Sequence, residues 1–231
     1  MRILAFESSA KACSVALTED GRLIGEYYQN CGQTHSRTLL KMAEDLLKNC
    51  DIPTVDAVAC AAGPGSFTGV RIGVAAAKGY AWGAELPCVG VSTLEAMAYQ
   101  AASFTGIVCC VMDARRQQVY HARFRCEKGQ FTRLCEDCAI SLEDLQEALA
   151  QETAPILFVG DGAKLCHEAL GYPCAPEHLM MQRASGVALV AEQALARGES
   201  ADGAALNPNY LCLSQGERER NERITRETLN K

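Results

Sequence analysis

Two apolar runs in the sequence each end in a carboxylate. The run at residues 2–6 stops at Glu7, which two serines follow, and the run at residues 107–112 stops at Asp113. A carboxylate at the end of a buried strand can bind Mg²⁺ and, through it, a phosphate group. It can also form a turn in which its oxygens accept backbone N–H groups. The two positions therefore predict either a phosphoryl- or carbamoyl-transfer site or structural turns.

A glycine-rich turn, GPGSFTG, follows the apolar run at residues 55–62. Gly63 and Gly65 end the strand predicted for that run, and Ser66 or Thr68 can cap the helix that comes next. A strand, a turn and a helix N-terminus in this order present free N–H groups to an anion such as phosphate. The spacing matches neither the Walker nor the Rossmann pattern, so the turn alone does not predict a nucleotide site.

The helix after the turn carries small residues at three- and four-residue spacings, among them four glycines. A glycine inside a helix costs about 1 kcal/mol relative to alanine, so this helix needs a compensating close contact. Packing on the chain's own sheet and packing on a helix of a second chain are both open. For the second case we predict a contact shared with the neighbouring helix at residues 36–49, and expect Gly73→Ala to be neutral or stabilising for the chain alone. The predicted contact residues are Leu39, Leu40, Ala43, Gly69, Gly73, Ala76, Ala77 and Tyr80.

Thirteen cysteines are scattered through the chain, many of them singly within apolar runs. Such thiols behave as small hydrophobic side chains in a reducing compartment, so a cytoplasmic location is expected. The only CxxC pair is Cys135 and Cys138, and a structural zinc ion would need two more ligands, for which only Cys126 or His121 is near. A cysteine-based redox or zinc protein is therefore a further class of function.

The composition is that of an ordinary soluble domain of 231 residues. No segment approaches the roughly 20 unbroken apolar residues of a membrane span, and no secretory signal is expected because the first apolar run stops at Glu7. With 28 acidic against 22 basic residues, the chain has no global electrostatic footprint for nucleic acid. We expect it to bind RNA poorly by itself.

The order of predicted elements repeats once along the chain. A strand, a carboxylate, a turn and two more strands open the sequence, and the same series starts again after residue 104. The predicted strands cover residues 2–6, 12–17, 22–28, 55–62, 88–91, 107–112, 118–125, 131–135 and 156–159. The predicted helices begin near residues 34, 66, 92, 141 and 185. A repeat of this kind indicates two similar lobes, which we place at residues 1–104 and 105–231.

The glycine motif GPGSFTGVRIG, together with Asp113-Ala114-Arg115-Arg116 and Gly160-Asp161-Gly162, resembles the TsaB (YeaZ) family over nearly the whole chain. The resemblance implies a two-lobed α/β fold of the actin/hexokinase/Hsp70-like (ASKHA) type, with duplicated ribonuclease H-like mixed sheets flanked by helices. It also implies a scaffold subunit that works with TsaD and TsaE. Their complex transfers a threonylcarbamoyl group to N6 of adenosine 37 in tRNAs that read codons beginning with A.

The same resemblance implies partners: a heterodimer with TsaD, transient contact with the ATPase TsaE, tRNA only through the complex, a homodimer when alone, and no membrane. In TsaD a Val-Asn-His-x-x-Gly-His stretch carries two metal-binding histidines, and the matching positions here are Thr93 and Met97. Neither is a normal divalent-metal ligand, so no metal site and no catalytic residue are expected. An active ATP-dependent phospho- or carbamoyltransferase of the same fold stays the alternative. One departure from the family is Cys212, where Tyr-Leu-Arg is usual.

A vestigial cofactor site is a further expectation. ATP or ADP would bind there only in the assembled complex. The candidate residues are Glu7, Ser8, Gly63, Gly65 and Asp113.

Overall fold

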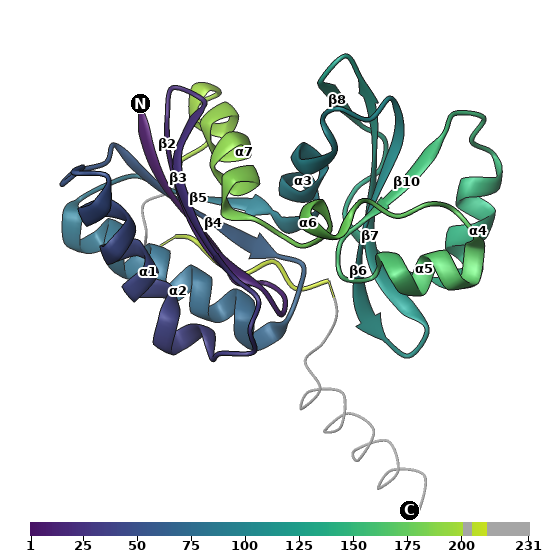
Figure 1. Ribbon diagram of the computed structural model, residues 1–231, viewed down its shortest axis with the longest axis horizontal. Coiled ribbons are helices and arrows are strands. Elements are labelled where there is room, and N and C mark those ends of the chain that lie inside the picture. Colours follow the sequence, from purple (N-terminus) through teal and green to yellow (C-terminus); the bar gives the residue numbers. More distant parts are fainter. Residues whose placement is uncertain (201–204, 212–231) are drawn as a thin grey trace, which may run out of the picture.

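Two lobes lie side by side in the computed structural model, which describes residues 1–200 and 205–211 (Figure 1). The sheet of the first lobe has the strand order β3-β2-β1-β4-β5, in which β1, β2 and β3 are antiparallel and β4 and β5 run parallel to β1. These strands are β1 (Arg2–Glu7), β2 (Cys13–Glu19), β3 (Arg22–Gln29), β4 (Ala57–Gly63) and β5 (Cys88–Ser92).

The second sheet repeats this arrangement. Its strand order is β10-β6-β7-β8, with an antiparallel series β6, β7, β8 and with β10 parallel to β6. Strand β9 also pairs with β7, at the start of β7, whereas β8 pairs with the end of β7. The strands are β6 (Gly106–Arg115), β7 (Gln118–Glu127), β8 (Gln130–Arg133), β9 (Cys138–Ser141) and β10 (Ile156–Val159). The repeat and the two-lobed α/β fold predicted from the sequence are confirmed.

Helices cover both faces of the first sheet (Figure 1). Helices α1 (His35–Asn49) and α2 (Phe67–Ala84) pack on one face, and α7 (Ala184–Ala196) packs on the other. In the second lobe, α4 (Leu142–Ala150) and α5 (Ala163–Leu170) share a core with β6 and β10. Helix α3 (Thr93–Ala98) reaches from the end of β5 to pack on β6 and β7. Two short helices, η1 (Tyr99–Ala101) and α6 (Glu177–Met180), contact each other, and α6 lies at the junction of the two lobes (Figure 1).

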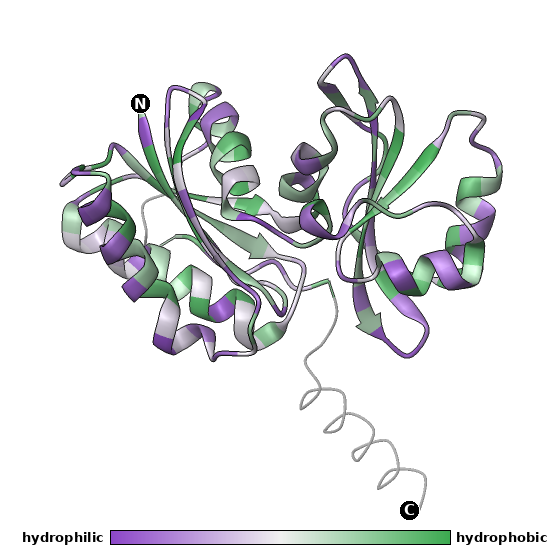
Figure 2. Cartoon of the chain, viewed as in Figure 1, coloured by the Kyte–Doolittle hydropathy of each residue, from purple (hydrophilic) through white to green (hydrophobic). Residues whose placement is uncertain are grey.

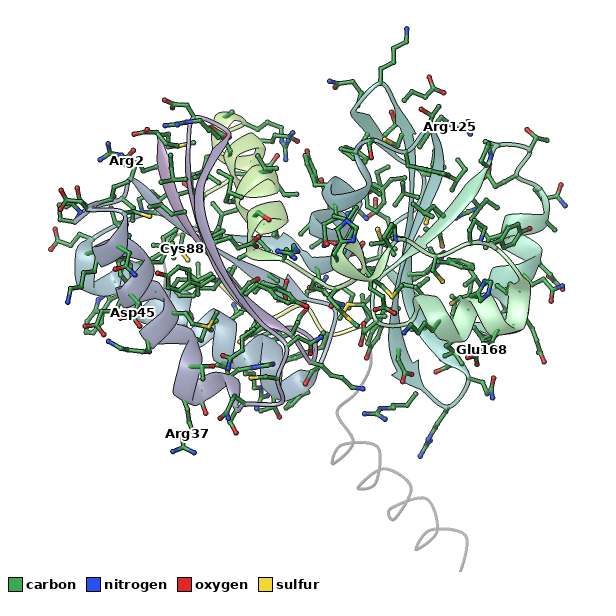
Figure 3. All side chains as sticks on the ribbon, viewed as in Figure 1. Arg2, Arg37, Asp45, Cys88, Arg125 and Glu168 are labelled. Atoms are coloured by element: carbon green, nitrogen blue, oxygen red, sulfur yellow. The ribbon has the colours of Figure 1, made fainter. Side chains whose placement is uncertain are left out.

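Strand β4 is apolar along nearly its whole length because it lies inside the sheet, with helices on both faces. All of its residues are buried, and alternate side chains enter two different cores. Val58 and Cys60 face the core under α1 and α2, whereas Ala57 and Ala59 face α7. Figure 2 shows the resulting hydrophobic centre along the strands, and Figure 3 shows labelled charged side chains such as Arg37 and Glu168 on the outside.

Four elements differ from the sequence-based expectation. Strand β9 and helices α5 and α6 were not predicted, since each is only four to eight residues long. Helix α7, which the predicted boundary assigns to the second lobe, packs on β1, β2, β4 and β5 of the first lobe. Its small residues, such as Ala188 and Ala191, permit this close approach to the alanines of β4. Within the described residues, no helix is both long and apolar enough to cross a membrane.

Candidate functional site

A cleft of about 610 Å³ opens between the two lobes. Its walls are the β1–β2 turn, the glycine turn before α2, the β6–β7 hairpin, residues 161–164 and 180–181 of the second lobe, and the chain segment at residues 209–211. Of the five predicted cofactor residues, Gly65 and Asp113 line this cleft. Glu7, Ser8 and Gly63 lie behind it, buried within the first lobe. The strand ends that the sequence singled out therefore meet, but only part of the predicted set can touch a ligand.

Glu7 forms a turn with its own neighbours. Its Oε1 accepts the backbone N–H of Ser9 at 2.6 Å, while Oε2 is buried and has no protein partner. The pKa of Glu7 is raised to about 7, mainly by burial and to a smaller extent by the nearby charge of Asp161, against the hydrogen bonds from Ser9 that lower it. The structural role as a turn former, left open by the sequence, is the one the hydrogen bond supports. A carboxyl group in this state carries a proton about half of the time at neutral pH.

Asp113 behaves in a similar way at the second strand end. Its Oδ1 accepts the backbone N–H of Arg115 at 2.7 Å, and the side chain is exposed at the cleft. The hairpin that follows is strained, because Arg115, Arg116 and Gln117 all have positive φ angles, of 69°, 53° and 60°. Residues of this kind persist only where the surrounding structure holds them, which is common at binding sites.

Asp161 is a cleft residue that the sequence analysis did not select. Its Oδ1 accepts the side-chain amide of Gln182 at 2.9 Å, and burial together with Asp113 raises its pKa. Lys11 lines the same cleft and partly offsets that rise. The available signal was the carboxylate between two glycines in Gly160-Asp161-Gly162, a pattern that places it at the end of strand β10.

The two positions that match the metal-binding histidines of TsaD are part of the core. Thr93 and Met97 are both fully buried, and Thr93 Oγ1 has no protein partner. Neither side chain is a suitable ligand for a divalent ion of the usual kind. Within the described ranges 1–200 and 205–211, no group of three or more His, Cys, Asp or Glu residues could hold a metal ion.

The CxxC pair lies beside a histidine but in the wrong geometry for zinc. Cys138 Sγ is 3.3 Å from Nδ1 of His121, whereas Cys135 Sγ is 3.8 Å from Nε2 of the same ring. Because the two thiols meet different ring nitrogens, a single ion cannot take all three as ligands. Burial lowers the pKa of His121 to about 4, so the ring is neutral at physiological pH.

The inward face of α2 packs on its own lobe. A Cβ on Gly69 would overlap the carbonyl oxygen of Ser8, and a Cβ on Gly73 would lie 2.6 Å from Ser8 Oγ. That hydroxyl donates a hydrogen bond to the Gly69 carbonyl at 2.8 Å. The expectation that Gly73→Ala is neutral or stabilising stays a prediction, but the close approach opposes it, since the new methyl group would have to displace this hydroxyl. Six of the eight predicted contact residues are buried in the chain itself, namely Leu39, Ala43, Gly69, Gly73, Ala76 and Ala77.

The outward face of α2 carries a second series of small residues. Ala75, Gly79 and Gly83 follow one another at four-residue spacing and are exposed, and Cβ atoms on the two glycines would meet nothing within 4 Å. Leu40 on α1 is 55% exposed and Trp82 on α2 is 83% exposed. The predicted contact with a second chain stays a prediction, and of its eight residues Leu40 and the half-buried Tyr80 are accessible.

The segment at residues 205–211, here called the C-terminal strap, closes one end of the cleft. Leu206 is buried in the core under α2, against Gly90. The backbone N–H of Asn209 donates to the Ala62 carbonyl at 2.6 Å, and its carbonyl oxygen lies so close to Gly63 that only glycine fits there. The predicted cofactor role of Gly63 therefore competes with a packing role. Cys212 lies outside the described residues.

Comparisons with known proteins agree with this architecture. A family model described as TsaD, tRNA N6-adenosine threonylcarbamoyltransferase, matches residues 29–216, more than half of the chain. The sequence is 33% identical over 227 residues to the tRNA threonylcarbamoyladenosine biosynthesis protein TsaB of Bacillus subtilis (strain 168), covering 94% of this chain and 96% of that protein. It is 39% identical over 167 residues to TsaB of Escherichia coli (strain K12), covering 70% and 72%.

Solved structures give the same result. YeaZ from Pseudomonas aeruginosa superposes with a TM-score of 0.80 at 28% identity, over 91% of this chain and 99% of that one. The ethanolamine utilization protein EutJ from Carboxydothermus hydrogenoformans has a TM-score of 0.50 at 14% identity, covering 82% and 89%, which shows a shared fold alone.

Proposed function

Because the chain belongs to the TsaB (YeaZ) family of tRNA threonylcarbamoyladenosine biosynthesis proteins, we propose that it is a non-catalytic subunit of the complex that makes this modification. In that role it acts in the cytoplasm with TsaD and TsaE. The complex transfers the threonylcarbamoyl group to N6 of adenosine 37 in tRNAs that read codons beginning with A. The chain contacts tRNA only within this complex.

The observation that carries the proposal is the core position of Thr93 and Met97. These residues stand where the catalytic relative TsaD has its metal-binding histidines, and here both are buried among apolar side chains. Restoring two imidazoles there would require a polar, hydrogen-bonded setting that the core does not provide. The side chains at this place support packing between α3 and β6 rather than chemistry.

A reconstitution tests the proposal directly. We expect the purified chain to form no modified tRNA when it is given threonylcarbamoyl-AMP and tRNA, and to be required when TsaD and TsaE are added. The reason is that residues 1–200 and 205–211 hold no group of ligands for a metal ion that would polarise the acyl carbonyl. The measurement is the modified nucleoside in digested tRNA, by mass spectrometry. Modification by this chain without TsaD would refute the proposal.

A second candidate is an ATP-dependent phospho- or carbamoyltransferase with its own site in the cleft. The observation that favours it is the pair of carboxylates, Asp113 and Asp161, at the cleft walls. Calorimetric titration of the isolated chain with ATP and Mg²⁺ separates the two functions. Binding followed by turnover would favour the enzyme, whereas nucleotide binding only after TsaD is added would favour the subunit.

The outer face of α2 is the contact that we propose for TsaD, and for a second copy when the chain is alone. Small residues at Ala75, Gly79 and Gly83 allow a partner helix to approach closely, and Trp82, exposed on the same helix, supplies apolar area. Leu40 is the other large exposed apolar side chain on α1 and α2. The inner series of small residues is already used by the chain's own sheet, so it is not available to a partner.

Replacing Gly79 with leucine should weaken binding to TsaD by about 5- to 150-fold, because the overpacked side chain costs about 1–3 kcal/mol at a close helix contact. The variant should fold as well as the wild-type chain, since nothing lies within 4 Å of the new Cβ. Sedimentation velocity with and without TsaD measures association, and a thermal melt checks folding. A matched control is Glu168→Leu, which places the same bulk on exposed α5 (Figure 3). Equal association of both variants would contradict the contact.

A further inference from the structure

Two side chains of the first turns of α2, Phe67 and Arg71, form a stack with Tyr210 of the C-terminal strap. The rings of Phe67 and Tyr210 are 4.7 Å apart at an angle of 27°, and the guanidinium carbon of Arg71 lies 3.8 Å from the centre of the Phe67 ring. Arg71 Nε donates a hydrogen bond to the Tyr210 hydroxyl at 2.7 Å. The C-terminal strap thus fixes the conformation of an arginine on the partner-facing helix.

The stack leaves most of the arginine's hydrogen-bonding capacity unused. Only Nε has a recorded acceptor, so the two Nη groups have no partner among the residues the structure describes. Arg71 is exposed and Tyr210 is 40% exposed. A guanidinium group presents its donors in a planar fork that matches a carboxylate with two parallel hydrogen bonds. A side chain held in advance loses less entropy on binding than a free one.

The position of Arg71 connects it to the outer face of α2. It precedes Ala75 by four residues and Gly79 by eight, so these residues share one side of the helix. The first turn of α2 contains no acidic side chain that would compensate either Arg71 or the positive end of the helix dipole. The proposed docking face is therefore apolar along its length and positive at this end.

We propose that the stack of Phe67, Arg71 and Tyr210 is the charged anchor of this docking face, and that it binds a carboxylate side chain of the partner subunit TsaD. The inference rests on the proposed function and adds the chemistry of one contact to it. The strap then has two roles, since it closes the cleft and positions the anchor. An RNA phosphate is the other anion that could accept hydrogen bonds from the Arg71 guanidinium group, and the test below distinguishes the two.

The test compares Arg71→Met with the wild-type full-length chain. Methionine keeps an apolar side chain over Phe67 but removes the charge and the fork. We expect affinity for TsaD to fall about 30-fold or more, as for a truncated interfacial charge pair. We also expect the wild-type affinity to weaken with added NaCl and that of the variant to depend less on salt. Tyr210→Phe keeps the stack and loses the hydroxyl, so it should weaken binding by a smaller factor.

Other outcomes would overturn the inference. If Arg71→Met leaves the affinity for TsaD and its salt dependence unchanged and only lowers the melting temperature, Arg71 serves only to hold the C-terminal strap in place. Unchanged affinity for TsaD, with loss of tRNA binding by the assembled complex, would assign the fork to phosphate. If Gly79→Leu disrupts the complex with TsaD and Arg71→Met does not, the proposed docking face is supported and the proposed role of Arg71 is refuted. If the wild-type chain forms no complex with TsaD, both proposals fail together.

Discussion

Replacing Glu7 with glutamine should raise the free energy of unfolding by about 3 kcal/mol at pH 8 and change it little at pH 4.5. The buried carboxyl group ionises near pH 7 in the folded chain, against 4.5 for an ordinary glutamate. Glutamine has the shape of the protonated acid, keeps an oxygen for the N–H of Ser9, and never acquires a charge. It therefore removes a cost that the wild-type protein bears only when Glu7 is ionised.

The sign of this effect follows from proton counts. Between pH 4.5 and pH 7 the folded state holds the Glu7 proton and the unfolded state has lost it, so wild-type stability falls as pH rises. Asp161, whose pKa is also raised by burial, acts in the same direction. His121 acts in the opposite direction: its pKa is lowered to about 4, so its contribution is lost as pH falls from 6.5. The wild-type curve alone mixes these effects, and the difference from Glu7→Gln isolates one.

Urea unfolding of the two proteins at half-unit steps from pH 4.5 to pH 8 measures this difference. The two curves should separate steadily between pH 4.5 and pH 7 and run parallel from there to pH 8. Curves that stay parallel throughout would mean that Glu7 ionises at its ordinary pKa and that the orphaned Oε2 is hydrated. Glu7→Asp is not a suitable control, because it shortens the turn as well as changing the acid.

Local sequence patterns predicted the elements whose apolar residues recur regularly or whose ends are marked by glycine or a capping residue. Strand β10 matches the predicted range, since a four-residue apolar run followed by Gly160 permits little else. Ser66 caps α2 as expected, with its Oγ accepting the N–H of Gly69. The duplicated lobes followed from the repeated order of strand, carboxylate and hairpin. In these cases the physical cause lies within a few residues of its effect.

The candidate site was predicted less well because the residues that contact one another there are far apart in the sequence. Nothing near Gly63 indicates that Asn209 will press against it, and nothing near Arg71 indicates Tyr210 as its partner. Spacing on α2 showed that the helix needed close contacts, yet spacing alone could not say which small residues face the sheet. Which side of α2 faces the lobe is fixed by contacts of Gly69 and Gly73 with the hydroxyl and carbonyl groups of Ser8. Ser8 reaches the helix only in the folded lobe.

The two series of small residues on α2 should respond to the same substitution with opposite signs. We expect Gly69→Ala to lower stability by about 2 kcal/mol, because a gain of about 1 kcal/mol in helix propensity is outweighed by a clash worth about 3 kcal/mol. The clash is with the backbone oxygen of Ser8, which cannot rotate away as a side chain can. The neighbouring Ser9 carbonyl accepts the N–H of Ser66, and this bond fixes the turn in place.

Gly79→Ala is the matched control ten residues along the same helix. Nothing lies within 4 Å of its new Cβ, so the propensity gain is unopposed and stability should rise by about 1 kcal/mol. For a chain of this size, the melting temperature should fall by about 4–8 °C in Gly69→Ala and rise by about 2–4 °C in Gly79→Ala. Differential scanning fluorimetry of both variants with the wild type measures the shifts. Shifts of the same sign would show that α2 does not sit on the Ser8 turn as described, and that its glycines are equivalent.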